Sequence, residues 1–281
     1  MKLYVCDYYL NKIIEIKYKL IQFSDSQNQI VLTSDFVNTD IENVKIVSRL
    51  SWNDLQNIIL AVKALKRLNV VNIYLEVPYM LGARSDRCFE DGSTHYLKDV
   101  ICPIINSLEF KSVSVLDPHS NVLEACLDNF VEMSMTPFYD WFIEEALITT
   151  QDKQLSFIIS PDYGAIKRTN FIAKEYGFEK VLNCSKIRDI KTGKILDTNI
   201  PITDFGKRNC IIVDDICDNG NTFINLAKEL KERNAGKIIL VVTHSIQENG
   251  LNRILNYIDE IYTTNSVNDY EINNVIVFNL F

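Results

Sequence analysis

The chain has 281 residues, of which 47% are hydrophobic and 23% charged, a composition typical of soluble globular proteins with one or two domains. Its formal net charge of −8 argues against broad, sequence-independent nucleic-acid binding, which needs clustered Lys and Arg. No apolar run reaches the length of a membrane span, and the first residues lack the long apolar run of a signal peptide. We therefore expect neither nucleic acid nor a membrane as a partner.

The seven cysteines form no C-x-x-C pair, so neither a zinc site nor a disulfide framework is indicated. Most lie in apolar runs, where a free thiol behaves as a small buried hydrophobe in a reducing compartment. The predicted location is the cytoplasm, or the host cytoplasm if a phage encodes the protein.

The first half alternates short β-rich runs with stretches that carry apolar residues at helical spacing. We predict strands at 44–47, 70–77 and 112–116, and helices at 53–68 and 93–108. The β-α-β-α-β order predicts a parallel sheet with helices on its faces.

The second half repeats this pattern, with a polar, loop-like stretch at 185–206. Strands are predicted at 155–160, 180–183, 210–213, 238–243, 260–263 and 274–278, and helices at 165–176, from 223 onward and at 249–257. We place a surface link within 130–153 and predict two α/β domains, 1–145 and 146–281. In such folds ligands collect at the carboxyl ends of the strands.

Residues 210–223 are the most specific motif of the chain. Asp214 and Asp215 close a buried strand, and a short polar loop at 218–222 leads into an amphipathic helix. Backbone N–H groups at a helix N-terminus suit a phosphate, and the carboxylates suit sugar hydroxyls or a hydrated Mg²⁺. Alternatively, Asp214 and Asp215 are only water-exposed carboxylates at the end of a strand. That interpretation does not explain why a glycine loop follows them directly.

Other polar groups follow strands of the first half. Arg84, Asp86 and Arg87 share one loop, and arginine forks onto phosphate oxygens. Taken alone, a surface loop with a local salt bridge explains these residues better. His119 follows the 112–116 strand in an Asp-Pro-His sequence, which suits a metal or phosphate contact, although a lone His is more often structural.

Two further groups lie in the second half. Asp162 stands between a strand and a helix, where capping of the helix N-terminus explains it fully. Lys186 and Arg188 enter the polar loop and can close over a transferring phosphoryl group, although exposed basic residues often have no role. The P-loop, the dinucleotide fingerprint, the zinc-protease motif and the nucleophile elbow are missing.

Together, these motifs resemble the ribose-phosphate pyrophosphokinases, from about residue 20 to the C-terminus. The phosphoribosyl-binding loop of that family resembles residues 213–222. Its companions occur in the family's order: Pro78-Tyr79, Ala83-Arg84-Ser85-Asp86-Arg87, Asp117-Pro118-His119, Ser160-Pro161-Asp162 with Gly164 and Arg168, Lys186 and Arg188, and Thr243-His244.

The resemblance implies two domains of the phosphoribosyltransferase type, dimer-based homo-oligomers such as hexamers, and Mg²⁺ as cofactor with ATP as co-substrate. It implies that the anomeric hydroxyl of a 5-phosphorylated ribose attacks the β-phosphorus of ATP and releases AMP. The implied sugar-phosphate ligands are Asp214, Asp215, Asp218, Asn219, Gly220, Asn221 and Thr222. The implied ATP contacts are Phe23, Asp25, Arg84, Ser85, Asp86 and His119; the metal contacts are His119, Asp162, Asp214 and Asp215; and the catalytic loop carries Lys186 and Arg188.

Three departures from the family pattern give the chain the character of a divergent, phage-type member. Ser85 stands where the family usually has Gln, and residues 88–97 differ from the regulatory loop of the cellular enzymes. The phosphate loop reads Asn-Gly-Asn-Thr at 219–222 in place of Thr-Gly-Gly-Thr. Asn221 thus adds a side chain where a backbone normally approaches a phosphate closely.

Several functions stay open on the sequence. Ribose 5-phosphate is the expected acceptor, and ADP-ribose, which would give ADP-ribose 1-pyrophosphate for NAD⁺ synthesis, is the second. A catalytically silent regulatory homologue is a third possibility, although the presence of Lys186, Arg188, His119 and Asp162 counts against it. A phosphoribosyltransferase shares the loop but needs no Asp-x-His or ATP segment.

Overall fold

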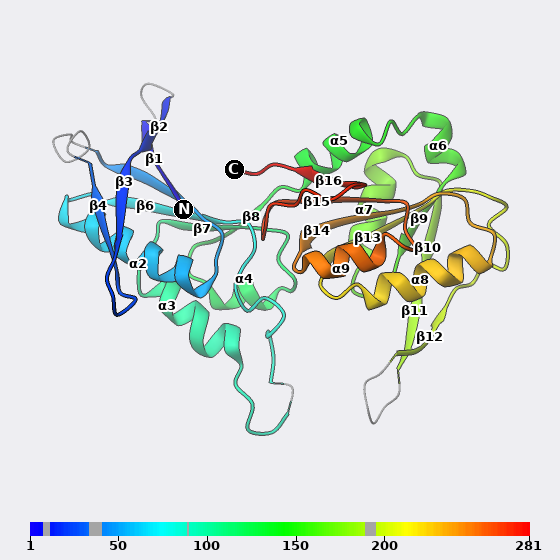
Figure 1. The fold of residues 1–281 in the computed structure, drawn as a ribbon, viewed down its shortest axis with the longest axis horizontal. Helices are drawn as coiled ribbons and strands as arrows, with labels where there is room; N and C mark the ends of the chain where they lie inside the picture. Colours follow the sequence, from blue (N-terminus) through cyan, green and yellow to red (C-terminus); the bar gives the residue numbers. More distant parts are fainter. Residues whose placement is uncertain (8–11, 34–40, 89, 189–194) are drawn as a thin grey trace. The chain divides into compact units, whose positions relative to one another are not determined.

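The computed structural model describes residues 1–7, 12–33, 41–88, 90–188 and 195–281; for 6, 7, 12, 13, 186–188 and 195–198 it describes the backbone alone. The chain divides into two compact units, Met1–Ser134 and Met135–Phe281, shown in Figure 1. Each unit is a mainly parallel sheet flanked by helices, which confirms the predicted fold class.

The division falls earlier in the chain than the predicted boundary between 145 and 146. Helix α5 (Thr136–Glu145) buries Phe138, Tyr139 and Phe142 in a core cluster formed by residues of the second unit. Burial of three large aromatic side chains strongly stabilises a contact, and this explains why α5 belongs to the second unit.

The first unit is built on a six-stranded sheet. Its order is β2 (Lys12–Ile16), β1 (Lys2–Asp7), β5 (Asn43–Val47), β6 (Asn72–Val77), β7 (Ser112–Leu116) and β8 (Phe130–Met133). The last four strands are mutually parallel, whereas β1 is antiparallel to both of its neighbours. The carboxyl ends of β6 and β7 therefore lie side by side at one edge.

The helices of the first unit are α2 (Trp52–Arg67), α3 (Cys102–Asn106), α4 (Val122–Cys126) and a π-helical turn, η1 (Leu97–Ile101). Helix α2 begins at a capping box, in which Ser51 and Asp54 each bond the backbone N–H of the other, and it buries its apolar face in the core. The predicted helix at 93–108 begins later, because the Ser93 hydroxyl and the Glu90 backbone bond each other in a turn. Such local bonds compete with helix formation.

A separate hairpin, β3 (Tyr18–Gln22) with β4 (Asn28–Leu32), was not predicted. Its β4 strand alternates buried and exposed residues, and the Asn28 amide donates to Asn53 and Asn57 of α2. The hairpin thus packs on a helix and not in the main sheet.

The second unit contains a sheet whose strands are all parallel. Its order is β10 (Lys180–Asn183), β9 (Phe157–Ser160), β13 (Cys210–Cys217), β14 (Ile238–Ser245), β15 (Glu260–Thr264) and β16 (Val275–Phe278). From β9 the chain continues through α7 (Ile166–Tyr176) to β10 on one side. From β13 it continues through α8 (Asn221–Glu232) to β14 on the other side.

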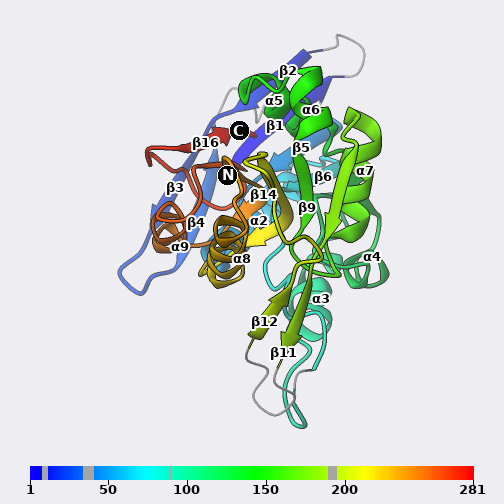
Figure 2. The ribbon, with the colours of Figure 1, turned by 90° about the vertical axis from the view of Figure 1, so that its right-hand side faces the viewer.

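Alternate residues of the central strands bury two separate cores. Ile212 of β13 packs with α8 and with α9 (Glu248–Ile254), whereas its neighbours Ile211 and Val213 pack with α5 and α7. Figure 2 shows the second unit from another side. A parallel strand buried on both faces reads as a continuous apolar run, which is why the sequence predicted strands at 210–213 and 238–243. Strand β13 is longer than predicted, since it continues through Asp214 and Asp215 to Cys217.

Two stretches differ from their predictions. Residues 185–206 include an antiparallel pair, β11 (Ser185–Arg188) with β12 (Ile195–Asn199), which projects from the second sheet in Figures 1 and 2. The expected surface link at 151–153 lies in a short helix, α6 (Thr150–Leu155), which a Thr149–Asp152 capping box begins. Within the described residues, no helix combines the length and apolar character needed to cross a membrane.

Candidate active site

The second unit contains a topological switch point between β9 and β13. The pairing of these strands ends at Ile159 and Ile212, and β13 runs on past it, so that Asp214 and Asp215 extend beyond the end of β9. Open parallel sheets bind ligands in the crevice outside such a point. The motif that the sequence singled out therefore occupies the place where this fold class binds its ligands.

The loop after β13 leads directly into the N-terminus of α8. Gly220 is the N-cap residue, its φ is 77°, and no side chain caps the helix. The first N–H groups of an α-helix have no partner within the helix, so those of Asn221, Thr222 and Phe223 have no acceptor in α8. Together with the helix dipole, they form an anion-binding end.

Helix α9 holds this loop in close backbone contact. A Cβ on Gly250 would lie 2.0 Å from the Asp218 carbonyl oxygen, and one on Gly220 would lie 2.5 Å from Ile254. Gln247 donates to the Asp218 carboxylate at 2.9 Å. Arg253 donates to the Asn219 carbonyl at 3.2 Å and to the Asn221 side-chain oxygen at 2.9 Å.

The acidic pair at the end of β13 is electrostatically strained. Burial raises the pKa of Asp214 well above its usual range, and the charges of Asp215 and Asp162 raise it further. The Asp215 backbone N–H, which donates to the Asp214 carboxylate at 2.9 Å, opposes that shift. A cation beside these carboxylates would relieve the repulsion and lower the pKa again.

Mg²⁺ suits this arrangement only if other ligands complete its shell. In the described part of the chain, no group of three or more His, Cys, Asp or Glu side chains is arranged to hold a metal ion. Mg²⁺ usually binds one or two carboxylates together with waters and substrate phosphates. Asp214 and Asp215 fit that role, with the remaining ligands supplied by substrate and water.

Asp162 does not cap a helix, in contrast to its structural explanation from sequence. Helix α7 begins at Ile166 with Ala165 as its N-cap residue, and the Asp162 carboxylate accepts from the Gly164 N–H at 3.0 Å. Its charge acts on Asp214. The structure thus brings Asp162 into the electrostatic environment of the acidic pair.

In the first unit, the loop after β6 carries an ion pair whose carboxylate is buried. Asp86 is buried and accepts two bonds from Arg87, at 2.8 Å to Nε and 3.1 Å to Nη2. The pKa of Asp86 is lowered chiefly by the bond from Arg87, against burial, with further lowering from Ser120 and His119. The loops after β6 and β7 are therefore neighbours, as their adjacent strands require.

The two loops expose positive charge around this pair. Arg84 and His119 are exposed, and the Arg87 side chain is 68% exposed. Asp117, which precedes Pro118 and His119, has a φ of 46°. A non-glycine residue in the left-handed region is strained, and such strain concentrates at functional sites.

The remaining predicted residues lie elsewhere. Phe23 and Asp25 form the tip of the β3–β4 hairpin, closed by the Phe23 N–H bond to the Gln27 carbonyl, and Asp25 accepts from the Gln27 N–H. Figures 1 and 2 both show this tip apart from the loop that follows β6. Lys186 and Arg188 are on β11, and their side chains lie outside the described residues.

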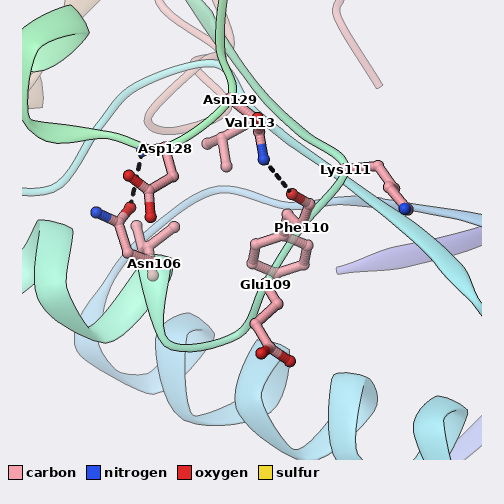
Figure 3. Close-up of a pocket in the computed structure, with 8 residues that line it drawn as sticks. Asn106, Glu109, Phe110, Lys111, Val113, Asp128 and Asn129 are labelled. Carbon is pink, nitrogen blue, oxygen red and sulfur yellow. Dashed lines mark hydrogen bonds between the residues drawn. The ribbon is translucent and has the colours of Figure 1, made fainter.

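A pocket of about 270 Å³ in the first unit is a different feature. It lies where β7 and β8 begin, at the sheet edge opposite Asp117 and His119, and Figure 3 shows its lining. Asn106 accepts from the Asp128 N–H, and the Asn129 amide donates to the Phe110 carbonyl. These polar groups thus bond the pocket's own backbone, and the pocket is not part of the candidate site.

Sequence reasoning missed three residues that contact the loop after β13. The contacts of Gln247, Gly250 and Arg253 depend on how α9 packs against that loop. The one local signal was Gly250 inside a helical pattern, since such a glycine often has a packing reason.

Comparison with known proteins gives a consistent result. A model of the phosphoribosyl synthetase-associated domain matches residues 194–276. Ribose-phosphate pyrophosphokinases from Sulfolobus acidocaldarius and Mycoplasmopsis pulmonis are 25% and 26% identical, over 92% and 89% of this chain and 86% and 76% of theirs. The chain is thus similar to ribose-phosphate pyrophosphokinases along most of its length.

The fold of the chain agrees with that of a solved structure. Phosphoribosylpyrophosphate synthetase from Mycobacterium smegmatis superposes with a TM-score of 0.78 at 16% identity, over 94% of this chain and 86% of that one. The two-unit parallel architecture is therefore shared.

Gly220→Ala should destabilise the second unit more than Gly206→Ala. Both glycines have positive φ, but only the Cβ at 220 would meet another side chain. Left-handed strain costs about 1–2 kcal/mol at either site, and overpacking adds a further 1–3 kcal/mol at 220. Urea denaturation measures the free energy of unfolding of both variants. In a Trp52→Phe background, Trp141 fluorescence reports on the second unit alone. Equal losses would show that the contact with Ile254 is not tight.

Asp214 should make the metal-free protein less stable as the pH rises. Its pKa is raised in the folded state, so the folded chain binds more protons than the unfolded chain above the ordinary Asp pKa of about 3.9. The free energy of unfolding then falls as the pH rises through that window, and Asp214→Asn should flatten the fall. Denaturation in EDTA from pH 4 to 8 measures how steeply the free energy of unfolding depends on pH in wild type and in Asp214→Asn.

Asp204→Asn is a control in which the pKa of the replaced carboxyl is shifted in the opposite direction. The Gly206 N–H bond lowers the pKa of Asp204, so this change should lower stability above the ordinary Asp pKa. A pH slope in Asp214→Asn as steep as that of wild type would contradict the assignment to Asp214.

Proposed function

We propose that the protein transfers the β,γ-pyrophosphoryl group of ATP to the C1 hydroxyl of a 5-phosphorylated ribose. The similar proteins are ribose-phosphate pyrophosphokinases, which supports this reaction type. The observation that carries the proposal is the joining of Asp214 and Asp215 to the uncapped, glycine-led N-terminus of α8. One short segment thus offers carboxylates for sugar hydroxyls and N–H groups for the 5-phosphate.

The reaction moves one group between two oxygens. The C1 hydroxyl oxygen bonds to the β-phosphorus, the bond from that phosphorus to the bridging α-oxygen breaks, and AMP leaves with the α-phosphate. The hydroxyl proton passes to water or buffer. With ribose 5-phosphate as acceptor, the product is phosphoribosyl pyrophosphate.

The residues have distinct parts in this proposal. The N–H groups of residues 219–222 bind and orient the 5-phosphate, and the carboxylates of Asp214 and Asp215 accept from the ribose hydroxyls. In the first unit, Arg84 and Arg87 bind phosphate oxygens of ATP, and Asp86 orients Arg87. Bound Mg²⁺ neutralises phosphate charge.

ADP-ribose is a second candidate acceptor. Asn221 carries a side chain at the phosphate loop and is exposed, as is Asn219. An exposed loop of this kind leaves space for a group beyond the 5-phosphate. The acceptor would then carry a diphosphate in place of the monophosphate, with the same chemistry at C1.

We also propose that the protein is located in the cytoplasm.

Release of AMP from ATP with each sugar tests the reaction. We expect AMP, in stoichiometric amounts with the pyrophosphorylated sugar, from ribose 5-phosphate or from ADP-ribose when Mg²⁺ is present. Ribose lacking a 5-phosphate is the matched control and should give little product. No AMP with either acceptor would contradict the enzyme and favour a silent homologue. Consumption of phosphoribosyl pyrophosphate with a nucleobase would favour a phosphoribosyltransferase instead.

Lys186→Ala should reduce turnover strongly while leaving ATP binding in place. Removing one group that stabilises transition-state charge costs about 10²–10³ in kcat, whereas the proposed ATP contacts lie in the first unit. Single-turnover AMP release and equilibrium ATP titration separate the two effects. Lys180→Ala, on β10, removes the same charge elsewhere in the second unit and should behave as wild type. Near-normal turnover in Lys186→Ala would exclude β11 from the catalytic loop.

A further inference from the structure

One exposed arginine joins both asparagines of the phosphate loop. Arg253 is in the last turn of α9, and its two Nη atoms donate separately, to the Asn219 carbonyl at 3.2 Å and to the Asn221 Oδ1 atom at 2.9 Å. The first bond holds backbone and the second holds a side chain. Both held groups flank Gly220, the N-cap residue of α8.

The bond to Asn221 fixes the direction of its amide. A guanidinium has only donors, so the amide must turn its oxygen to Arg253 and its NH₂ group away. Among the described residues, that NH₂ group donates to no protein acceptor. It therefore stays available to an anion, at the first residue of a helix whose N–H groups favour anions.

The bond to Asn219 also favours anion binding, in this case by directing a backbone carbonyl. A carbonyl oxygen that faced the anion would repel it. Arg253 binds the Asn219 carbonyl on the α9 side of the loop, which leaves backbone N–H groups to face the ligand. Fixed dipoles of this kind need no reorganisation when a charged ligand arrives.

We propose that Arg253 is a positioning residue that turns the Asn221 amide NH₂ toward the phosphoryl group on the ribose 5-oxygen. This inference rests on the proposed function, since it assumes that the α8 N-terminus binds that group. Asn221 then acts as a substrate contact, and Arg253 acts through it and through the Asn219 carbonyl.

Steady-state kinetics of Arg253→Ala, Asn221→Ala and the double variant test the coupling. With the acceptor that releases AMP, each single change should raise its KM about tenfold, because a hydrogen bond to a charged group is worth about 1.5–3 kcal/mol. The KM for ATP and kcat should change less than twofold. The double variant should be no worse than either single variant, since both remove one interaction.

Two further variants separate positioning from charge and folding. Lys231→Ala removes a positive charge from the far end of α8 and should leave both KM values unchanged. Arg253→Lys keeps one donor and should recover part of the lost acceptor binding. Multiplying effects in the double variant would overturn the proposal in favour of a direct charge effect. Equal rises in both KM values, or an unchanged acceptor KM, would overturn it as well.

Titration of the full chain with inorganic phosphate separates this inference from the proposed function. If no acceptor releases AMP, the pyrophosphokinase proposal fails, but the positioning role still predicts that phosphate binds wild type and binds Arg253→Ala and Asn221→Ala about tenfold more weakly. Isothermal titration calorimetry measures this. Equal phosphate affinity in the three proteins, or none in wild type, would overturn the positioning role.

Discussion

The site in the second unit depends on the contact between the backbone of α9 and the loop after β13. Gly250 approaches the Asp218 carbonyl so closely that a Cβ would lie 2.0 Å from the oxygen. Leu251 and Ile254 of the same helix are fully buried with residues of α8. The apolar core beneath the two helices thus fixes where the loop carbonyls and N–H groups point. An anion site built in this way is preorganised by packing.

The charge of this site explains how an acidic chain can suit anionic substrates. Burial, and after it the charges of Asp215 and Asp162, raise the pKa of Asp214, and three carboxylates on their own would repel a phosphate. The uncapped N-terminus of α8 attracts it. Asp214 and Asp215 would hold a divalent cation, whose positive charge would offset the first effect and add to the second. On the proposed function, metal and sugar phosphate therefore favour each other's binding.

The sequence predicted the parts of the site that are contiguous in the chain. Strand, acidic pair, glycine loop and helix follow one another in residues 210–223, and each step has its own local signal. The grouping of Asp162 with Asp214 was implied only by the family resemblance, because from the sequence itself helix capping explained Asp162. Arg253 was not predictable, because its role depends on the packing of α9. The pairing of 185–188 with 195–199 was hidden by polar residues that carry no apolar alternation.

The two units have the same parallel-sheet design but use different chemistry at their carboxyl edges. The first unit offers arginine side chains on loops, one of them oriented by a buried carboxylate. Such side chains reach and follow a flexible polyphosphate. The second unit offers backbone N–H groups fixed by helix packing, which suit one phosphate at one position. Asn221 is the exception within that rigid frame: Arg253 holds its side-chain oxygen, and on the proposed function its amide would discriminate among groups on the ribose 5-oxygen.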